Sequence, residues 1–203
     1  MTDLKVFPYG PLASNMYILS TDSGIFIIDP SVYPDRLKES DIPSKVDYIL
    51  ITHGHFDHIN AVDEWSRMYP EAEVYISSDD MDALTDPENN GSSYFAEKCN
   101  YETVPLSIDD LEFDGLTVIK TPGHSKGSVC FLFEIDGKKI MFTGDTLFAG
   151  SCGRTDLPGG NSAQIMSSLR LLSGLDPSIK VFPGHGPSST IAIELASNPF
   201  FNF

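Results

Sequence analysis

All five histidines of the chain fall in short segments rich in Gly, Pro or Asp, and each segment directly follows an apolar run. Neutral imidazole nitrogens and carboxylate oxygens are ligands that zinc, iron and manganese accept. Histidines that are concentrated at the ends of apolar runs, with none left elsewhere, therefore indicate a metal site. The five are His53, His55, His58, His124 and His185.

The segment His-Gly-His-Phe-Asp-His at 53–58 contains three of these histidines and a carboxylate. In an extended segment His53 and His55 point to the same side, and the following turn carries Asp57 and His58 elsewhere. One short motif can therefore supply ligands to two adjacent metal ions. The other candidate ligands each follow a further apolar run: His124, Asp145 and His185.

Seven ligands are too many for one ion, so two divalent metal ions are expected. Zinc is the first expectation, with iron and manganese as alternatives. Protein ligands alone leave each ion an open position, which a bridging hydroxide can occupy as the nucleophile. The predicted division is three ligands for the first ion, three for the second and one bridging carboxylate: His53, His55 and His124; Asp57, His58 and His185; and Asp145.

Strands are expected to position these ligands. The apolar runs are short, rich in β-branched and aromatic residues and bounded by Gly, Pro or Asp, which is typical of strands. Four of the runs end in candidate ligands, and the ends of strands in packed sheets can converge on one site. Asp136-Gly137 predicts a hairpin turn, and helices are expected at Ile59–Met68 and Ala163–Leu172. The predicted strands are Met16–Leu19, Ile25–Ile28, Val46–Thr52, Val74–Ser77, Leu116–Thr121, Val129–Ile135, Lys139–Phe142 and Lys180–Phe182.

Two other features each allow two interpretations. The polar segment Met81–Tyr101 predicts a helix fragment and a surface excursion, which is either a lid over the site or a solvated connection. Asp29 either orients a ligand histidine from behind or starts a turn with Pro30, and we favour the turn.

Composition limits the function classes. The chain has 203 residues with 13 Lys and Arg against 29 Asp and Glu, a net charge of −16, and 41% hydrophobic residues. We expect one domain over residues 1–203, a cytoplasmic location, no nucleic-acid partner and no membrane partner, since no apolar run spans a bilayer and no signal peptide is visible. Three cysteines without a CxxC pair argue against a disulfide framework: Cys99, Cys130 and Cys152.

Four longer stretches carry a family resemblance that spans Asn15 to Phe200: THGHFDH, TPGHSKGSVCF, FTGDTLFAGSCGRTDLPGGN and PGHGPSST. They resemble the metallo-β-lactamase superfamily, and within it the short single-domain bacterial members of the glyoxalase II branch. The resemblance implies an α+β fold, a four-layer αβ/βα sandwich of two mixed β-sheets flanked by helices, with the metals at one edge. Asn15 and Tyr17 match a position near the family's first hairpin, and we interpret them as structural.

Differences from other members of the superfamily limit the branch to which the chain is similar. His55 stands where flavodiiron oxygen reductases carry Glu, and Asp145 stands where the zinc β-lactamases have no bridging carboxylate. Full-length glyoxalase II enzymes hold glutathione with a C-terminal helical domain, whereas this chain ends about twenty residues after His185. The stretch Gly150–Asp156 is also similar to iron-dependent persulfide dioxygenases, in which one iron suffices.

The function expected from these residues is a binuclear metal-dependent hydrolase of a small thioester, such as S-lactoylglutathione, attacked by the metal-bridging hydroxide. All five histidines are used as ligands, so none remains as a general acid, and a thiol with a pKa of about 8.5 can leave without one. Asp57 is a ligand that can also accept a proton. The alternatives are an iron-dependent persulfide dioxygenase, a hydrolase of another ester and a metal-binding scaffold without catalysis.

Two cationic residues are candidates for contact with substrate. Arg154 can fork onto a substrate carboxylate, or it can pair with Asp156 inside its own loop. Lys126, beside His124, can attract an anionic substrate or be an ordinary exposed lysine. The expected partner is a small-molecule thioester, glutathione-linked or not, and the oligomeric state stays open.

Overall fold

The computed structural model of the chain describes residues 2–95 and 99–201. Within these residues the first sheet has the strand order β1-β2-β3-β4-β5-β6, with antiparallel pairs up to β3 and parallel pairs from there on. Its strands are β1 (Asp3–Tyr9), β2 (Ser14–Ser20), β3 (Ile25–Ile28), β4 (Tyr48–Leu50), β5 (Glu73–Ile76) and β6 (Leu106–Ser107).

The second sheet has the order β13-β12-β9-β8-β7, in which only the β12–β9 pair is parallel. A separate two-stranded ribbon follows β9 in the chain and consists of β10 (Leu147–Phe148) and β11 (Ser151–Cys152). The strands of the second sheet are β7 (Leu116–Lys120), β8 (Val129–Ile135), β9 (Lys138–Gly144), β12 (Lys180–Pro183) and β13 (Ser189–Thr190).

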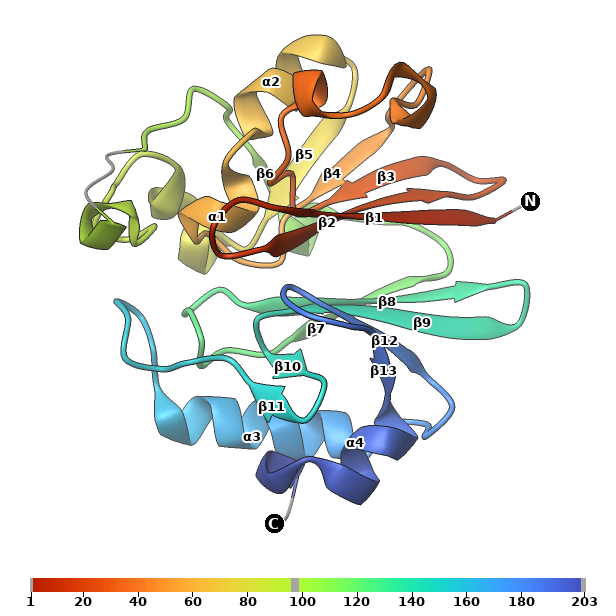
Figure 1. The fold of residues 1–203 in the computed structure, drawn as a ribbon, viewed down its shortest axis with the longest axis vertical. Helices are drawn as coiled ribbons and strands as arrows, with labels where there is room; N and C mark the ends of the chain where they lie inside the picture. The colour runs from red at the N-terminus through yellow and green to blue at the C-terminus, as the bar shows by residue number, and fades with distance from the viewer. Residues whose placement is uncertain (1, 96–98, 202–203) are drawn as a thin grey trace.

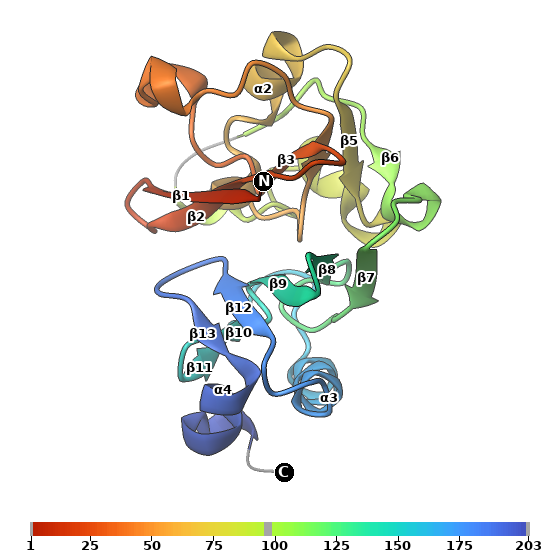
Figure 2. The ribbon, with the colours of Figure 1, turned by 90° about the vertical axis from the view of Figure 1, so that its right-hand side faces the viewer.

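Helices cover the outer faces of both sheets, as Figures 1 and 2 show from two directions. Helices α1 (Phe56–Ile59) and α2 (Val62–Met68) belong to the first half of the chain, and α3 (Ser162–Ser173) and α4 (Ile191–Ser197) to the second. The order helix, sheet, sheet, helix confirms the predicted four-layer αβ/βα sandwich of two mixed sheets. Short 3₁₀ helices lie at Pro34–Arg36, Glu39–Asp41, Ser78–Leu84, Ser92–Phe95, Ile108–Asp110 and Pro199–Phe201.

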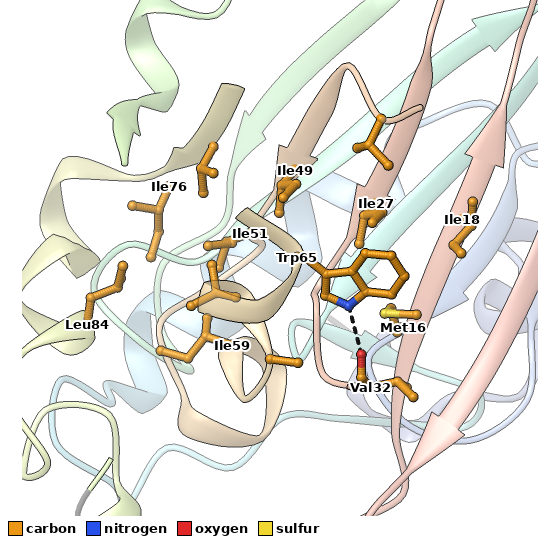
Figure 3. Close-up of a cluster of buried hydrophobic side chains, with 14 residues drawn as sticks. Met16, Ile18, Ile27, Val32, Ile49, Ile51, Ile59, Trp65, Ile76 and Leu84 are labelled. Carbon is orange, nitrogen blue, oxygen red and sulfur yellow. Dashed lines mark hydrogen bonds between the residues drawn. The ribbon is translucent and has the colours of Figure 1, made fainter. Parts of the chain in front are cut away.

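Both faces of the first sheet are buried, because alternate residues of a strand point to opposite sides. In β2, Met16 and Ile18 pack toward the helix layer, whereas Tyr17 and Leu19 pack toward the second sheet. Figure 3 shows the helix-side cluster around Trp65, whose Nε1 donates to the carbonyl oxygen of Val32 at 2.7 Å. A third cluster joins α3 to the outer face of the second sheet. The sandwich therefore has three apolar layers between its four structural layers.

The sequence predicted most strands to within a few residues, but the prediction of the first helix was wrong. In place of one helix over Ile59–Met68, α1 begins at Phe56 and a break separates it from α2. The break is at Ala61, whose φ and ψ are −116° and 21° and whose N–H donates to the carbonyl of Pro30 at 2.9 Å. This tertiary hydrogen bond replaces a bond within the helix. The start of α1 at Phe56 matters for the site, because it places the side chains of Asp57 and His58 on a helix.

The predicted hairpin turn is confirmed, and several elements were missed. Asp136 and Gly137 have φ values of 52° and 70°, and the flanking residues pair across the turn. Positive φ at both central positions is the geometry that Asp-Gly tolerates. The missed elements are β1, α4 and the two-residue strands β6, β10, β11 and β13, which are too short or too exposed to give a pattern.

None of the helices within residues 2–95 and 99–201 combines the length and the apolar character that crossing a bilayer requires.

The buried carboxylate of Asp63 fastens the chain after the 81–101 excursion to α2. Its oxygens accept hydrogen bonds from the N–H groups of Glu102 and Thr103 at 2.9–3.1 Å and from the Thr103 hydroxyl at 2.6 Å. Burial alone would raise the pKa of Asp63, but the hydrogen bonds from Thr103 and Glu102 outweigh it and lower the pKa. The ionised carboxylate is thus the form that the fold stabilises.

We expect Asp63→Asn to lower the free energy of unfolding at pH 7 by about 1–3 kcal/mol, because two backbone donors then share one carbonyl oxygen. A group whose folded pKa is depressed stabilises above the unfolded Asp pKa of about 3.9, and this contribution is lost as the pH falls through the folded pKa. Urea unfolding at several pH values would therefore show the wild type and variant converging in acid. The exposed Glu71→Gln is the matched control; a constant difference at every pH would contradict this account.

Candidate metal centre

Four strands deliver the predicted ligands to one edge of the sandwich. The segment that contains His53 and His55 follows β4 of the first sheet, and α1 carries Asp57 and His58. His124, Asp145 and His185 follow β7, β9 and β12 of the second sheet. The distances below show that all seven side chains come together, as the sequence predicted, although they come from both sheets.

The first group consists of His53, His55 and His124. One ring nitrogen from each lies within 4.8 Å of the others, and His55 Nδ1 is 2.7 Å from His124 Nε2. The ring centroid of His53 is 4.9 Å from that of His55 and 4.8 Å from that of His124. Three imidazoles this close leave room between them for a single small cation.

The second group consists of Asp57, His58 and His185, whose potential ligand atoms also lie within 4.8 Å of one another. His58 Nε2 is 3.3 Å from His185 Nε2, and His185 Nε2 is 3.4 Å from Asp57 Oδ2. Two nitrogens and one carboxylate oxygen therefore converge on a second point.

Asp145 lies between the two groups. Its Oδ2 is 3.4 Å from His124 Nε2 of the first group and 3.4 Å from His185 Nε2 of the second. Its Oδ1 is 3.3 Å from His58 Nε2. The carboxylate thus faces both groups at once, which is the position that a bridging ligand needs.

Two histidines of the first group, His53 and His55, are held in the neutral form that a metal requires. Burial lowers the pKa of His53 well below its usual value and that of His55 to about 3, and the neighbouring imidazoles add to this effect. The Nε2 atom of His53 is buried and has no hydrogen-bond partner among the described residues, whereas His55 approaches His124 through its Nδ1. Buried polar atoms are normally satisfied, so His53 Nε2 fits a group that accepts its lone pair, as a cation does.

The second group has the opposite electrostatics. Burial disfavours the charged form of His58, but the carboxylates of Asp145 and Asp57 outweigh burial and hold its pKa well above the usual value. His185 behaves likewise, with burial opposed by Asp145 and Asp57 and a pKa of about 9. Burial would raise the pKa of Asp145, yet His58 and His185 hold it well below its usual value. The carboxylates therefore favour positive charge at this point, and a cation can replace the protons.

Polar contacts from outside the two groups fix the ring orientations. His124 Nδ1 is 2.8 Å from the carbonyl oxygen of Arg154, and His185 Nδ1 is 2.9 Å from that of Leu12. A carbonyl oxygen can only accept, so each Nδ1 carries a proton, and Nε2 is the nitrogen that has the lone pair when the ring is neutral. Such contacts orient metal-binding histidines and select their tautomer.

Asp29 plays the same part for His58, so both interpretations of this residue hold. Its Oδ2 is 3.0 Å from His58 Nδ1, and its two oxygens accept from the N–H and hydroxyl of Thr52 at 2.7 and 2.8 Å. Asp29 has a φ of 53°, so the residue also makes the turn that the sequence suggested. The orienting contact, one of the two interpretations that the sequence left open, joins Asp29 to a histidine that lies 29 positions away in the sequence.

Asn15 and Tyr17 confirm their predicted structural role. The Asn15 amide donates to the carbonyl oxygens of Pro183 and Gly186 at 3.0 and 2.9 Å, and the Tyr17 hydroxyl donates to Pro183 at 2.7 Å. These bonds tie the loop that carries His185 to β2 of the opposite sheet.

A cavity of about 340 Å³ opens beside the two groups and is bounded by four of their residues and by Asp145. Its walls include Asn90, Gly91 and Phe95, so part of the 81–101 excursion lines the cavity; residues 96–98 of that excursion lie outside the described residues. The other apolar walls could not be predicted from the sequence, because single residues in loops have no periodicity. These walls are Leu12, Phe56, Phe148 and Leu157.

The structure places the two cationic candidates differently. Arg154 lines the cavity, but its guanidinium donates to both carboxylate oxygens of Asp156 at 2.6 and 2.7 Å, which is the internal pairing that the sequence left open. This pairing lowers the pKa of Asp156 to about 2. Lys126 lines a separate cavity of about 80 Å³ that also reaches His55.

We expect Asp29→Asn to weaken binding of a divalent ion by roughly 10- to 100-fold, as is typical for the partner of a ligand histidine. The Thr52 N–H still needs the amide oxygen, so the NH₂ group faces His58 Nδ1 and favours the tautomer with the proton on Nε2. Asn tolerates positive φ, so the turn persists. Competition with a chelator measures the affinity, and the exposed Asp35→Asn is the control. Unchanged affinity would show that Asp29 does not set the tautomer.

Comparison with known proteins identifies the family. The model of the metallo-β-lactamase superfamily matches residues 9–185. Hydroxyacylglutathione hydrolase GloC of Haemophilus influenzae is 32% identical over 216 residues, covering 98% of this chain and 98% of its own. This relative bears out the suspected glyoxalase II-like branch.

Two solved structures agree with the sandwich. BLEG-1, described as a B3 metallo-β-lactamase, superposes with a TM-score of 0.87 at 33% identity, covering 99% of this chain and 100% of its own. TTHA1623 in a di-iron-bound form gives a TM-score of 0.80 at 34% identity, covering 97% and 99%. The family match, the relatives and the His and Asp clusters agree, and the chain belongs to the metallo-β-lactamase superfamily of metal-dependent hydrolases.

Proposed function

We propose that this protein hydrolyses a small thioester by means of two divalent metal ions, with zinc as the first expectation. The observation that carries the proposal is the placement of Asp145 between two three-ligand groups at the floor of a mostly apolar cavity. Since the ligands come from both sheets, we also propose that residues 1–203 work as a single domain. The proposed ligands are His53, His55 and His124 for one ion, Asp57, His58 and His185 for the other, and Asp145 for both.

Two ions held in this way would lower the pKa of bound water toward about 7 and supply a hydroxide nucleophile. The protein side chains do the rest. Asp145 holds negative charge between the groups, and the apolar walls exclude water and hold the substrate against the ions. Burial raises the pKa of Asp57, but His58 and His185 outweigh burial and lower it, so its carboxylate is ionised at neutral pH and can accept a proton.

The nature of the leaving group favours a thioester. All five histidines of the chain lie in the two groups, so no imidazole is free to protonate a leaving amine or alkoxide. The Cys152 thiol at the cavity has a pKa raised by burial, so it offers no thiolate nucleophile. A thiol with a pKa of about 8.5 leaves as thiolate without a general acid. The name of the GloC relative points to the same substrate class.

The test is hydrolysis of S-lactoylglutathione by the purified protein, with and without oxygen. We expect about two divalent ions per chain and release of free thiol at equal rates in both atmospheres, because water is the only other reactant. Asp145→Ala should lose at least one ion and most of the activity, since it removes the charge between the groups. Metal analysis and a thiol-specific dye provide the two readouts.

Each competing function has its own outcome in this test. Oxygen consumption with glutathione persulfide by the iron-loaded protein, without thioester cleavage, would favour the persulfide dioxygenase. Hydrolysis of a β-lactam or a simple ester, again without thioester cleavage, would keep the hydrolase and overturn the thioester assignment. Full occupancy and normal activity in Asp145→Ala would overturn the two-metal site.

The pairing of Arg154 with Asp156 generates a further prediction. Because the guanidinium already occupies both oxygens of Asp156, we expect Arg154→Lys to change KM by the same factor for thioesters with and without a carboxylate. Steady-state kinetics on one substrate of each kind measures this ratio. A KM increase confined to the carboxylate-bearing thioester would instead show that Arg154 turns to bind substrate.

A further inference from the structure

A buried carboxylate outside the two groups contacts both segments that carry the first group. Asp80 lies in the 3₁₀ helix Ser78–Leu84 and is only 7% exposed. Its Oδ2 accepts from the Gly54 N–H at 3.0 Å and from the Ser125 hydroxyl at 2.6 Å, and its Oδ1 accepts from the Gly127 N–H at 2.7 Å. Three donors thus satisfy one carboxylate.

The partners of Asp80 are neighbours of the first group in sequence. Gly54 stands between His53 and His55, and Ser125 directly follows His124. Within the described residues, the hydrogen bonds of the Asp80 carboxylate go to Gly54, Ser125 and Gly127, and none reaches a residue of the second group. The second group has its own outer carboxylate, because Asp29 contacts His58.

Tight packing makes the three-way contact rigid. A Cβ atom added at Gly54 would lie 2.4 Å from Ala83 Cβ, and one added at Gly127 would lie 2.6 Å from Asp80 Cγ. These distances are far below van der Waals contact, so the two loops approach the 3₁₀ helix as closely as glycine permits. The loops cannot shift toward Asp80, and the hydrogen bonds prevent them from moving away.

From these contacts we propose that Asp80 is a positioning residue that aligns His55 with His124 and so sets the affinity of the first metal position, while the second position is independent of it. The assignment rests on the two-metal function proposed above. Asp80 acts through Gly54 and Ser125 and does not touch the substrate or the ions.

The negative charge and the acceptor-only chemistry of Asp80 are what the position requires. Two of its partners are backbone N–H groups on different oxygens, and an ionised carboxylate accepts on both sides. In Asp80→Asn one of these N–H groups faces an NH₂ group whichever way the amide turns. One loop then loses its anchor while the side-chain volume is kept.

The experiment is chelator competition on the metal-loaded protein, with the ions retained per chain measured at each chelator concentration. The wild type should release its ions in two steps. His185→Ala removes a ligand of the second group only, so the step that changes in this variant is the release of the ion from the second group. We expect Asp80→Asn to lower the affinity of the first group for its ion by roughly 10- to 100-fold. The affinity of the second group should be unchanged. Ser125→Ala, which removes one of the three bonds, should lower the affinity of the first group by less.

Asp79→Asn is the matched control, because Asp79 is an exposed carboxylate next to Asp80 in the same 3₁₀ helix; it should leave both steps unchanged. Equal weakening of both steps, no weakening, or weakening of the second-group step alone would each overturn the proposal. If Asp80→Asn does not fold, the Ser125→Ala result decides. A wild type that binds fewer than two ions would overturn the two-metal function itself, and this outcome is distinct from any result with the variants.

Discussion

The structure depends on the balance of charge around Asp145, a carboxylate that is only 8% exposed. Ionised Asp, when buried, is costly unless cations or donors surround it. Here three imidazoles from both sheets lie within 3.4 Å of its oxygens. This one side chain therefore holds the edges of the two sheets together and makes the point between them attractive to cations.

Close approach at this point sets demands on the backbone. A Cβ atom at Gly184 would lie 2.2 Å from Asp145 Oδ1, so any side chain there would displace the carboxylate. Gly144, next to Asp145, has a φ of 45° and lets the chain turn out of β9 toward the site. Gly184, before His185, is thus required because no side chain fits there. Gly144, before Asp145, is required because its backbone has a positive φ.

The sequence predicted what is written locally and missed what distant contacts decide. The strands and the ligand pattern were predictable because the apolar run of β2 and the HxHxDH spacing are properties of short segments. The break at Ala61 was not, because a hydrogen bond to Pro30 from another part of the chain creates it. The role of Asp80 was likewise hidden, and the sequence could not decide whether Asp29 orients a histidine, since each contact joins residues more than twenty positions apart.

Different groups form the two sides of this centre, although Leu12 and Arg154 hold histidines through their backbone carbonyls and also line the cavity. On the buried side, carboxylates and backbone carbonyls hold the histidines in strands and tight turns. On the open side, the cavity walls come from loops and short elements: the β1–β2 turn with Leu12, the 3₁₀ helix with Phe95 and the β10–β11 ribbon with Phe148.

Substitutions in these walls leave the ligand contacts intact, so the walls can change independently of the centre. This separation explains in physical terms how relatives described as a hydroxyacylglutathione hydrolase and a B3 metallo-β-lactamase share one fold with this chain. For the same reason, the seven proposed ligands indicate the type of reaction, whereas the choice of substrate depends on the loops that line the cavity.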